Sequence, residues 1–110
     1  MSMNSIVLAG RLGQNPQTQY FSSGACLTKC SLAVQKSKDE VSWFDLEVWG
    51  KPAEILANYT SKGSVIGVEG TLKIDIWKDK ENNYREKPVI KVSKVQLLSS
   101  NKKDAETEEE

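Results

Sequence analysis

The sequence predicts an all-β protein: a five-stranded Greek-key barrel with one short helix between its third and fourth strands. Three observations support this fold class. Apolar and polar residues alternate along most of the chain, the alternation changes once to a helical spacing, and turn-forming residues separate the extended stretches. The 110 residues are enough for one domain and a short tail.

The first two strands are predicted over residues 4–12 and 25–35. Turn-forming residues at 13–16 and a polar stretch at 17–24 separate them, and a charged connection at 36–40 follows the second strand.

The third strand, over residues 41–50, shows the clearest alternation. One face carries Phe44, Leu46 and Val48, and the other carries Trp43, Asp45, Glu47 and Trp49. A short helix is predicted to begin at Lys51-Pro52, since proline is tolerated in a first helical turn, and to stop at Gly63.

The fourth strand is predicted from Ser64 to Trp77, with a bulge or bend at its two glycines. Its apolar face, predicted to fill the core, consists of Ile66, Val68, Leu72, Ile74 and Ile76. A polar hairpin over residues 78–87, with its turn at Asn82-Asn83, leads to a fifth strand over 88–98.

This order of elements matches the OB-fold, a barrel that binds oligonucleotides and oligosaccharides. An SH3-like barrel is the second alternative, but it would not place a helix of two to three turns between the third and fourth strands. The barrel domain is predicted over residues 1–98, and residues 99–110 are predicted to be a disordered acidic tail.

The formal net charge of zero hides an uneven distribution. Residues 102–110 contain two lysines and five acids, which gives −3. The rest of the chain therefore has 13 basic and 10 acidic residues, which gives +3. A mildly basic domain with an acidic tail remains compatible with nucleic-acid binding.

All three tryptophans are predicted on the polar side of their strands. Exposed aromatic residues in a group usually mark an interaction surface, whereas packing under loops or in a subunit interface is the alternative. Lysines and arginines surround them, and cations interleaved with aromatics are typical of proteins that stack bases and contact phosphates. The flanking cations are Lys36, Lys38, Lys51, Lys73, Lys78, Lys80, Arg85 and Lys87, and Tyr84 lies among the last of them.

Little in the sequence favours catalysis. The chain has no histidine, no nucleophile motif and no phosphate-binding glycine loop, so no enzyme activity, metal or cofactor is expected. Asp45 and Glu47 could form a carboxylate pair, but a solvated strand face is the simpler interpretation, with both acids away from any bound nucleic acid or paired with lysines. Cys26 and Cys30, four residues apart on one predicted strand, lie too far apart for a disulfide and are expected to be reduced and partly buried.

The chain also resembles the bacterial and organellar single-stranded DNA-binding protein family. The matching motifs span most of residues 4–98 in the family's order: Asn4 to Pro16, Leu32-Ala33-Val34, Trp43-Phe44-Asp45, Val48 to Lys51, Ala53-Glu54, Tyr59, Lys62-Gly63-Ser64, and Val68-Glu69-Gly70 through Trp77. The resemblance implies an OB-fold, a homotetramer wrapped by single-stranded DNA, a role in replication, recombination and repair, and a cytoplasmic, nucleoid-associated or organellar location.

The residue pattern and the resemblance together predict roles for particular residues. Base stacking is expected at Trp43, Trp49, Trp77 and Tyr84. Backbone contacts are expected at Arg11, Lys36, Lys38, Lys51, Lys62, Lys73, Arg85 and Lys87, of which the family motif itself carries Arg11, Lys51, Lys62 and Lys73.

Two features depart from the family pattern. The loop at residues 36–42 is short and lacks a tryptophan, so a weaker grip on DNA is expected there. The sequence ends Glu108-Glu109-Glu110 rather than in a proline and phenylalanine tip, which puts docking of replication and repair proteins in doubt. Three other functions remain open: a carbohydrate-binding module, an enzyme using Asp45 and Glu47, and a paralogue that assists primosome assembly or recombination.

Overall fold

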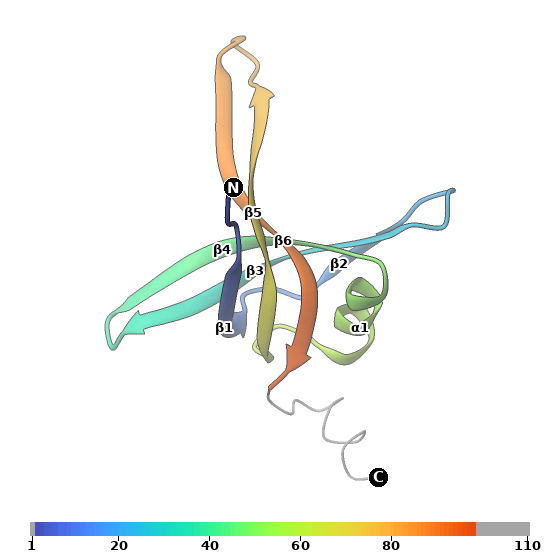
Figure 1. Ribbon diagram of the computed structural model, residues 1–110, viewed down its shortest axis with the longest axis vertical. Helices are drawn as coiled ribbons and strands as arrows, with labels where there is room; N and C mark the ends of the chain where they lie inside the picture. The colour runs from blue at the N-terminus through green and yellow to red at the C-terminus, as the bar shows by residue number, and fades with distance from the viewer. Residues whose placement is uncertain (1, 99–110) are drawn as a thin grey trace.

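A computed structural model describes residues 2–98 of the chain (Figure 1). Along the chain, the elements are β1 (Ile6–Leu12), β2 (Gln17–Tyr20), β3 (Cys26–Ser37), β4 (Glu40–Trp49), α1 (Lys51–Tyr59), β5 (Val65–Lys78) and β6 (Tyr84–Leu97). The predicted helix between two groups of strands is confirmed, although it ends at Tyr59, four residues before Gly63.

Five of the strands close into a barrel. The hydrogen-bonded order β1-β5-β6-β4-β3 returns to its start because β1 also pairs with β3 at Arg11–Ala33 and Leu12–Leu32. The β4–β6 pair is parallel and the other pairs are antiparallel. A closed five-stranded barrel with a helix between β4 and β5 is an OB-fold, so the predicted fold class is confirmed.

The strand β2 was not predicted, because its four residues are polar and show no apolar alternation. It pairs with β3 outside the closed barrel, in the register Gln17–Lys29 to Tyr20–Cys26. A hydrogen bond of 2.8 Å between the hydroxyls of Thr18 and Thr28 joins the two strands. Pairing with an existing strand therefore fixes this segment, and its own composition does not reveal it.

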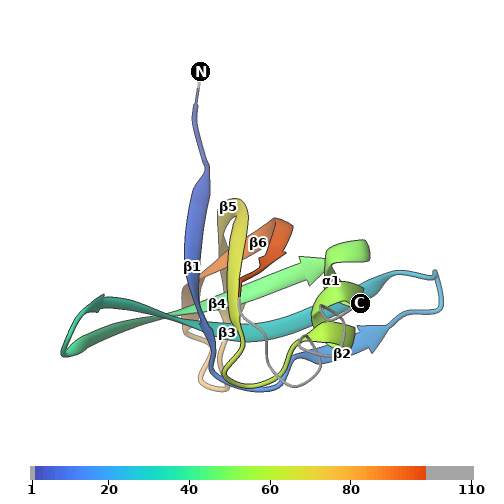
Figure 2. The same cartoon turned by 90° about the horizontal axis from the view of Figure 1, so that it is seen from below.

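The predicted charged connection after residue 35 is also largely strand. β3 continues to Ser37 and β4 starts at Glu40, so only Lys38 and Asp39 form the turn. Lys36 lies in a bulge between two paired residues of β3. The result is a long β3–β4 hairpin that projects from the barrel (Figures 1 and 2).

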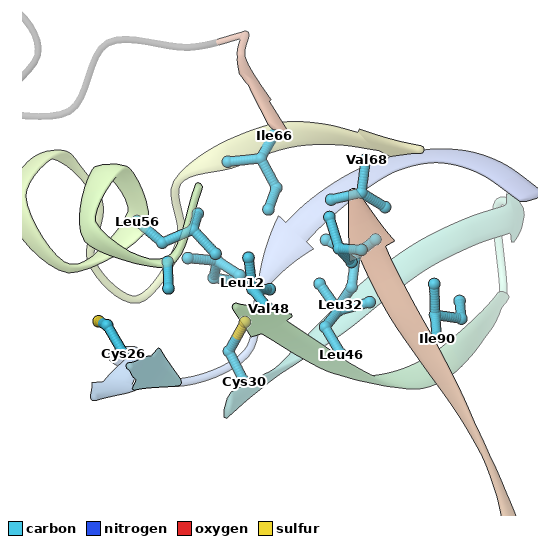
Figure 3. Close-up of a cluster of buried hydrophobic side chains, with 12 residues drawn as sticks. Leu12, Cys26, Cys30, Leu32, Leu46, Val48, Leu56, Ile66, Val68 and Ile90 are labelled. Carbon is cyan, nitrogen blue, oxygen red and sulfur yellow. The ribbon is translucent and has the colours of Figure 1, made fainter. Parts of the chain in front are cut away.

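The core lies inside the barrel and under α1 (Figure 3). Leu56 of the helix packs with strand residues such as Leu12, Leu32 and Ile66, all of them almost fully buried. The Thr28 hydroxyl donates a hydrogen bond of 3.0 Å to the carbonyl of Ala53, which ties the helix to β3. Figure 3 also shows both cysteines at this core, and both are free thiols; burial raises the pKa of the Cys30 thiol to about 12.

One prediction about the core is wrong. Ile66 and Val68 of β5 are buried, but Leu72, Ile74 and Ile76 on the same face of the strand are 41, 48 and 64% exposed. The reason is geometrical, because β5 and β6 continue beyond the barrel as a two-stranded hairpin (Figure 1). The alternation is therefore intact, but its apolar face leaves the core halfway along the strand.

Candidate nucleic-acid interface

The outer face of β3, β4, β5 and β6 brings several of the predicted aromatic and cationic residues together. Residues paired across neighbouring antiparallel strands share a face. The register therefore places Trp43 beside Ala33, Glu47 beside Lys29, Asp75 beside Lys87, and Trp77 beside Arg85. We call this surface the aromatic face, defined by Trp43, Asp45, Glu47, Trp49, Lys73, Asp75, Trp77, Arg85 and Lys87.

The predicted exposure of the tryptophans is confirmed. Trp43 is 62%, Trp49 38% and Trp77 45% exposed, whereas Leu46 and Val48 between the first two are buried. Burying an aromatic side chain would stabilise the fold by roughly 1.5–3 kcal/mol, so three exposed tryptophans contribute little to the stability of the isolated chain. Their position indicates an interaction surface.

The Trp43 ring lies directly over the backbone of Gly13, at the end of β1. A Cβ atom at Gly13 would stand 2.3 Å from Cζ3 of Trp43 and 2.9 Å from the Ser31 hydroxyl oxygen. Any side chain at this position would therefore displace the ring. Glycine allows Trp43 to lie along the surface of the barrel.

Trp49 has two contacts that orient its ring. Phe21, from the loop between β2 and β3, stacks on it with the ring centroids 5.9 Å apart and the planes 25° apart. The indole Nε1–H donates a hydrogen bond of 2.8 Å to Oε2 of Glu47. Phe21 was not predicted as part of the site. The sequence contains only a weak indication of its role, which is that this aromatic residue directly precedes the turn Ser22-Ser23-Gly24.

Tyr84 is separated from the tryptophans. It pairs with Lys78 at the tip of the β5–β6 hairpin, and the Lys78 ammonium lies 5.1 Å from the centre of its ring. Because side chains alternate along a strand, Tyr84 shares a face of β6 with Glu86, which pairs with Ile76 of β5. This face is on the side of the hairpin opposite Trp77. The register therefore does not bring Tyr84 onto the aromatic face.

Three of the predicted cations on this face form ion pairs with acids. Lys73 lies 2.9 Å from Glu47 and 3.3 Å from Asp75, Lys87 lies 3.1 Å from Asp45, and Arg85 lies 3.0 Å from Asp79. The expectation that Asp45 and Glu47 pair with lysines is confirmed. Hydrogen bonding to Glu47 raises the pKa of Lys73, so its ammonium is fully charged at neutral pH.

The Asp79 carboxylate orders the tip of the β5–β6 hairpin. It accepts hydrogen bonds from the backbone of Asn83 and Glu81, each 2.9 Å long, and from the Arg85 guanidinium. The backbone bond from Asn83 comes first among the causes that lower the pKa of Asp79, followed by the bond from Arg85. Asn82 takes a positive φ of 68°, which confirms a turn at the predicted Asn82-Asn83 site.

The other predicted cations lie around the aromatic face. Lys36 and Lys38 stand at the far end of the β3–β4 hairpin, and Lys51 is the first residue of α1. Arg11 donates a hydrogen bond of 3.0 Å to the carbonyl of Gly63, and Asn15 accepts one of 2.7 Å from the backbone of Lys62. The loop that carries Lys62 is thereby held against the end of β1.

A pocket of about 170 Å³ with polar and apolar lining lies within the aromatic face. Its lining residues include Gln14, Lys29, Ser31, Asp45, Glu47, Asp75 and Lys87. Lys29 was missed as a candidate, although it alternates with the core residues Cys30 and Leu32 and so could have been found by the same argument as Trp43. Both charge signs meet in this pocket, which suits polar groups better than an apolar ligand.

Neither a cluster of metal-ligating side chains nor a helix suited to crossing a membrane is found in the part of the chain that the structure describes. No group of three or more potential metal-ligating side chains comes together within residues 2–98. Within the same range no helix has the length and apolar character needed to cross a membrane.

The fold and the aromatic face define an OB-fold module with a surface suited to bases and phosphates. A family model described as "Single-strand binding protein family" matches residues 3–98. The chain belongs to this family, whose members are DNA-binding proteins and not enzymes.

Three curated relatives show how similar the chain is to other members. It is 50% identical over 111 residues to "Single-stranded DNA-binding protein 1" of Synechocystis sp., covering 96% of this chain and 92% of the relative. It is 45% identical to a protein of the same name from Nostoc sp., covering 91% and 87%. It is 40% identical to "Single-stranded DNA-binding protein" of Thermosynechococcus vestitus, covering 91% and 86%.

Proposed function

We propose that this chain binds single-stranded DNA irrespective of sequence and coats it during replication, recombination and repair. The observation that carries the proposal is the outward position of Trp43, Trp49 and Trp77 on one side of a closed OB barrel. Membership in the single-strand binding protein family and the names of its relatives support the same ligand.

In this proposal bases stack on the three tryptophans. Each stacked base contributes about 1–3 kcal/mol, and stacking tolerates every base because all have a π-face. Phe21 supports the Trp49 ring from one side, which favours Trp49 as a rigid platform. Tyr84 contacts DNA only where a strand passes across the tip of the β5–β6 hairpin.

Phosphates meet two kinds of cation. Lys36, Lys38, Lys51 and Lys62 form no ion pair with another residue of the range 2–98 and meet phosphate directly. Lys73, Arg85 and Lys87 must exchange a carboxylate for a phosphate, so each contributes less to affinity. Arg11 contacts the strand beside Gly63, where its side chain is already fixed.

The chain acts as a homotetramer in this proposal. An apolar hollow of about 670 Å³ lies over β1, β5 and β6, lined by residues such as Val7, Val68, Val95 and Leu98, and Val7 is largely exposed. Together with the exposed aliphatic face of the β5–β6 hairpin, it offers surface that further copies would bury.

The remaining proposals concern the whole protein. Residues 1–98 form the DNA-binding domain, and the protein acts in the cytoplasm with the nucleoid or in an organelle. The predicted acidic tail, residues 99–110, lies outside the described residues. Replication and repair proteins are proposed as further partners.

A fluorescence titration with poly(dT) tests the proposal. Tryptophan emission is expected to quench strongly at low salt, and affinity is expected to fall as salt rises because phosphate contacts release counterions. Oligonucleotides of increasing length give the occluded site size, and light scattering gives the number of subunits. Unchanged emission on adding poly(dT) at low salt would contradict DNA binding, and a monomeric mass would contradict the tetramer.

A further inference from the structure

Glu47 differs from the other acids of the aromatic face in being enclosed. The residue is 9% exposed and is the one charged residue among the buried positions of residues 2–98. The side chains of Asp45 and Asp75 on the same face are 51 and 42% exposed. A buried charge costs free energy unless it is hydrogen-bonded and paired, so the contacts of Glu47 need an explanation.

The Glu47 carboxylate joins a base-stacking residue to a phosphate-binding one. Its Oε2 accepts the hydrogen bond of 2.8 Å from Nε1–H of Trp49. The Lys73 ammonium lies 2.9 Å from Oε1 and 3.2 Å from Oε2. Glu47 on β4 thus holds Trp49 on its own strand and Lys73 on β5. The Lys73 side chain reaches across β6, which lies between these two strands.

The carboxylate is ionised over the physiological range. Burial alone would raise the pKa of Glu47, but the hydrogen bonds from Trp49 and Lys73, with the charges of Lys73 and Lys29, hold the pKa below the usual 4.5. An ionised carboxylate accepts stronger hydrogen bonds than a neutral one. Glu47 is therefore a permanent acceptor for the Trp49 indole.

This contact adds a second restraint to a ring that Phe21 already touches on one face. Phe21 contacts one face of Trp49, and Glu47 fixes the edge of the ring that carries Nε1. Ordering a surface side chain before the ligand arrives removes part of the entropy cost of binding. A preset ring therefore binds a base more tightly than a mobile one.

Resting on the DNA-binding function proposed above, we propose that Glu47 is a positioning residue that fixes Trp49 for base stacking, although its charge repels phosphate. Charge alone predicts that removing any acid from the aromatic face strengthens binding to a polyanion. Positioning predicts that the result depends on what replaces Glu47. A replacement that still accepts the indole hydrogen bond preserves affinity, and one that cannot accept it weakens binding.

Two substitutions separate these effects, because both remove the charge and keep a side chain of similar size. Glu47→Gln retains an oxygen acceptor for Trp49, and Glu47→Leu does not. We expect Glu47→Gln to bind poly(dT) at least as tightly as the unaltered chain. We expect Glu47→Leu to bind roughly fivefold more weakly than Glu47→Gln, at the lower end of what one stacked base contributes. Equal affinities of the two variants would overturn the proposal.

Two controls tie the effect to Trp49. In a Trp49→Phe background the ring has no N–H, so Glu47→Gln and Glu47→Leu are expected to bind equally. Asp45→Asn removes an acid of the same strand face that pairs with Lys87 and contacts no indole. It is expected to strengthen binding, because the change removes an acid from the aromatic face and frees Lys87 for phosphate. A fivefold difference that persisted without the indole N–H would mean that Glu47 acts through something other than Trp49.

A measurement without DNA keeps the proposal testable even if Glu47→Leu does not fold. In NMR spectra, the indole proton of Trp49 is expected to exchange with solvent more slowly than those of Trp43 and Trp77 and to shift as Glu47 is protonated below pH 4.5. Exchange as fast as at Trp43 would overturn the positioning role. Failure of the unaltered chain to bind poly(dT) would instead contradict the proposed function. The indole measurement would still test the contact between Glu47 and Trp49, because it is made without DNA.

Discussion

The two halves of β5 have the same alternation and different surroundings. In the first half Ile66 and Val68 are buried in the barrel. In the second half Leu72, Ile74 and Ile76 continue the same face but stand on a hairpin outside the barrel, with at least two fifths of each side chain exposed. Alternation therefore tells which residues share a face, but the length of the neighbouring strands decides whether that face is covered.

The second half also presents two faces with different chemistry. Trp77 and Lys73 lie on the aromatic face, and the aliphatic residues lie on the other. One strand thus contributes to the core, to the proposed DNA surface and to the proposed contact between copies. Substitutions along β5 separate these three roles.

The largest effect is expected at the buried half of the strand. Ile66→Ala removes a fully buried side chain and leaves a cavity, so we expect the free energy of unfolding to fall by about 2–5 kcal/mol. Ile76→Ala removes a side chain that is 64% exposed, and within an isolated chain we expect a change of at most about 0.5 kcal/mol. Urea unfolding followed by circular dichroism measures both.

Protein concentration sharpens this comparison. If copies bury the hairpin face, the cost of Ile76→Ala grows at concentrations where the chain is assembled, while the cost of Ile66→Ala remains large throughout. An equal loss for both variants at every concentration would show that the two halves of β5 do not differ as described.

The second prediction concerns Gly70, where β5 passes from the barrel to the hairpin. A Cβ atom there would stand 2.1 Å from the carbonyl oxygen of Lys91, a backbone atom of β6 that cannot move aside alone. At Gly67, three residues earlier, a Cβ would meet the end of the Leu98 side chain at 3.4 Å and the Leu8 carbonyl oxygen at 3.9 Å, both ordinary contact distances. We expect Gly70→Ala to lower the free energy of unfolding by about 1–3 kcal/mol.

The matched variant Gly67→Ala is expected to have a small effect, because the flexible end of Leu98 gives way. Thermal melts of the two variants at equal concentration provide the test. A Gly67→Ala variant less stable than Gly70→Ala would contradict the claim that close backbone approach fixes the turn from barrel to hairpin.

The sequence predicted most of this architecture. The closed barrel, the position of α1 and the outward tryptophans follow from local patterns that the tertiary structure leaves unchanged, as at Leu46 and Trp43. The pairing of Gln17–Tyr20 with β3 could not be predicted, since it depends on a partner strand and not on the composition of the segment. The exposure of Ile74 was not predicted for a related reason. The alternation along β5 is the same inside and outside the barrel, so it does not show where the barrel ends.

The site was predicted in part for the same reasons. Alternation placed Trp43, Trp49 and Trp77 on one surface, but it could not show that Phe21, 28 residues before Trp49, stacks on that ring. The ion pairs of Asp45 and Glu47 with lysines were expected, whereas the particular partners depend on register across three strands. Contacts between distant residues are the part that a local pattern does not contain.

The third prediction compares adjacent residues on the two faces of the hairpin. Trp77→Ala removes one stacking platform, so we expect poly(dT) affinity to fall by about 1–3 kcal/mol with little change in assembly. Ile76→Ser is expected to weaken assembly and to leave the affinity per barrel close to that of the unaltered chain. Fluorescence titration at fixed low salt and light scattering measure the two properties. An identical pattern of losses for both variants would mean that the faces do not have separate roles.

The smallest effect is expected from the ion pair that ties the hairpin half of β5 back to the barrel. Glu47 has a lowered pKa in the folded protein, so the stability that it contributes is present above the ordinary pKa of 4.5 and is lost as pH falls through the lowered value. Lys73 has a raised pKa, so its contribution is present below the ordinary value of 10.5 and is lost as pH rises through the raised value. Both losses are expected to be smaller than that caused by Gly70→Ala, because partly exposed ion pairs are screened by solvent.

Comparing urea unfolding of the unaltered chain with Glu47→Gln across this range isolates the pair. The variant has no carboxylate to protonate at this position, so the difference in stability between the two proteins is expected to shrink at the acidic end. Asp45→Asn serves as the matched control, since its carboxylate lies on the same strand but forms its ion pair with Lys87 of β6. A difference that stayed constant down to acidic pH would mean that ionised Glu47 does not stabilise the junction between barrel and hairpin.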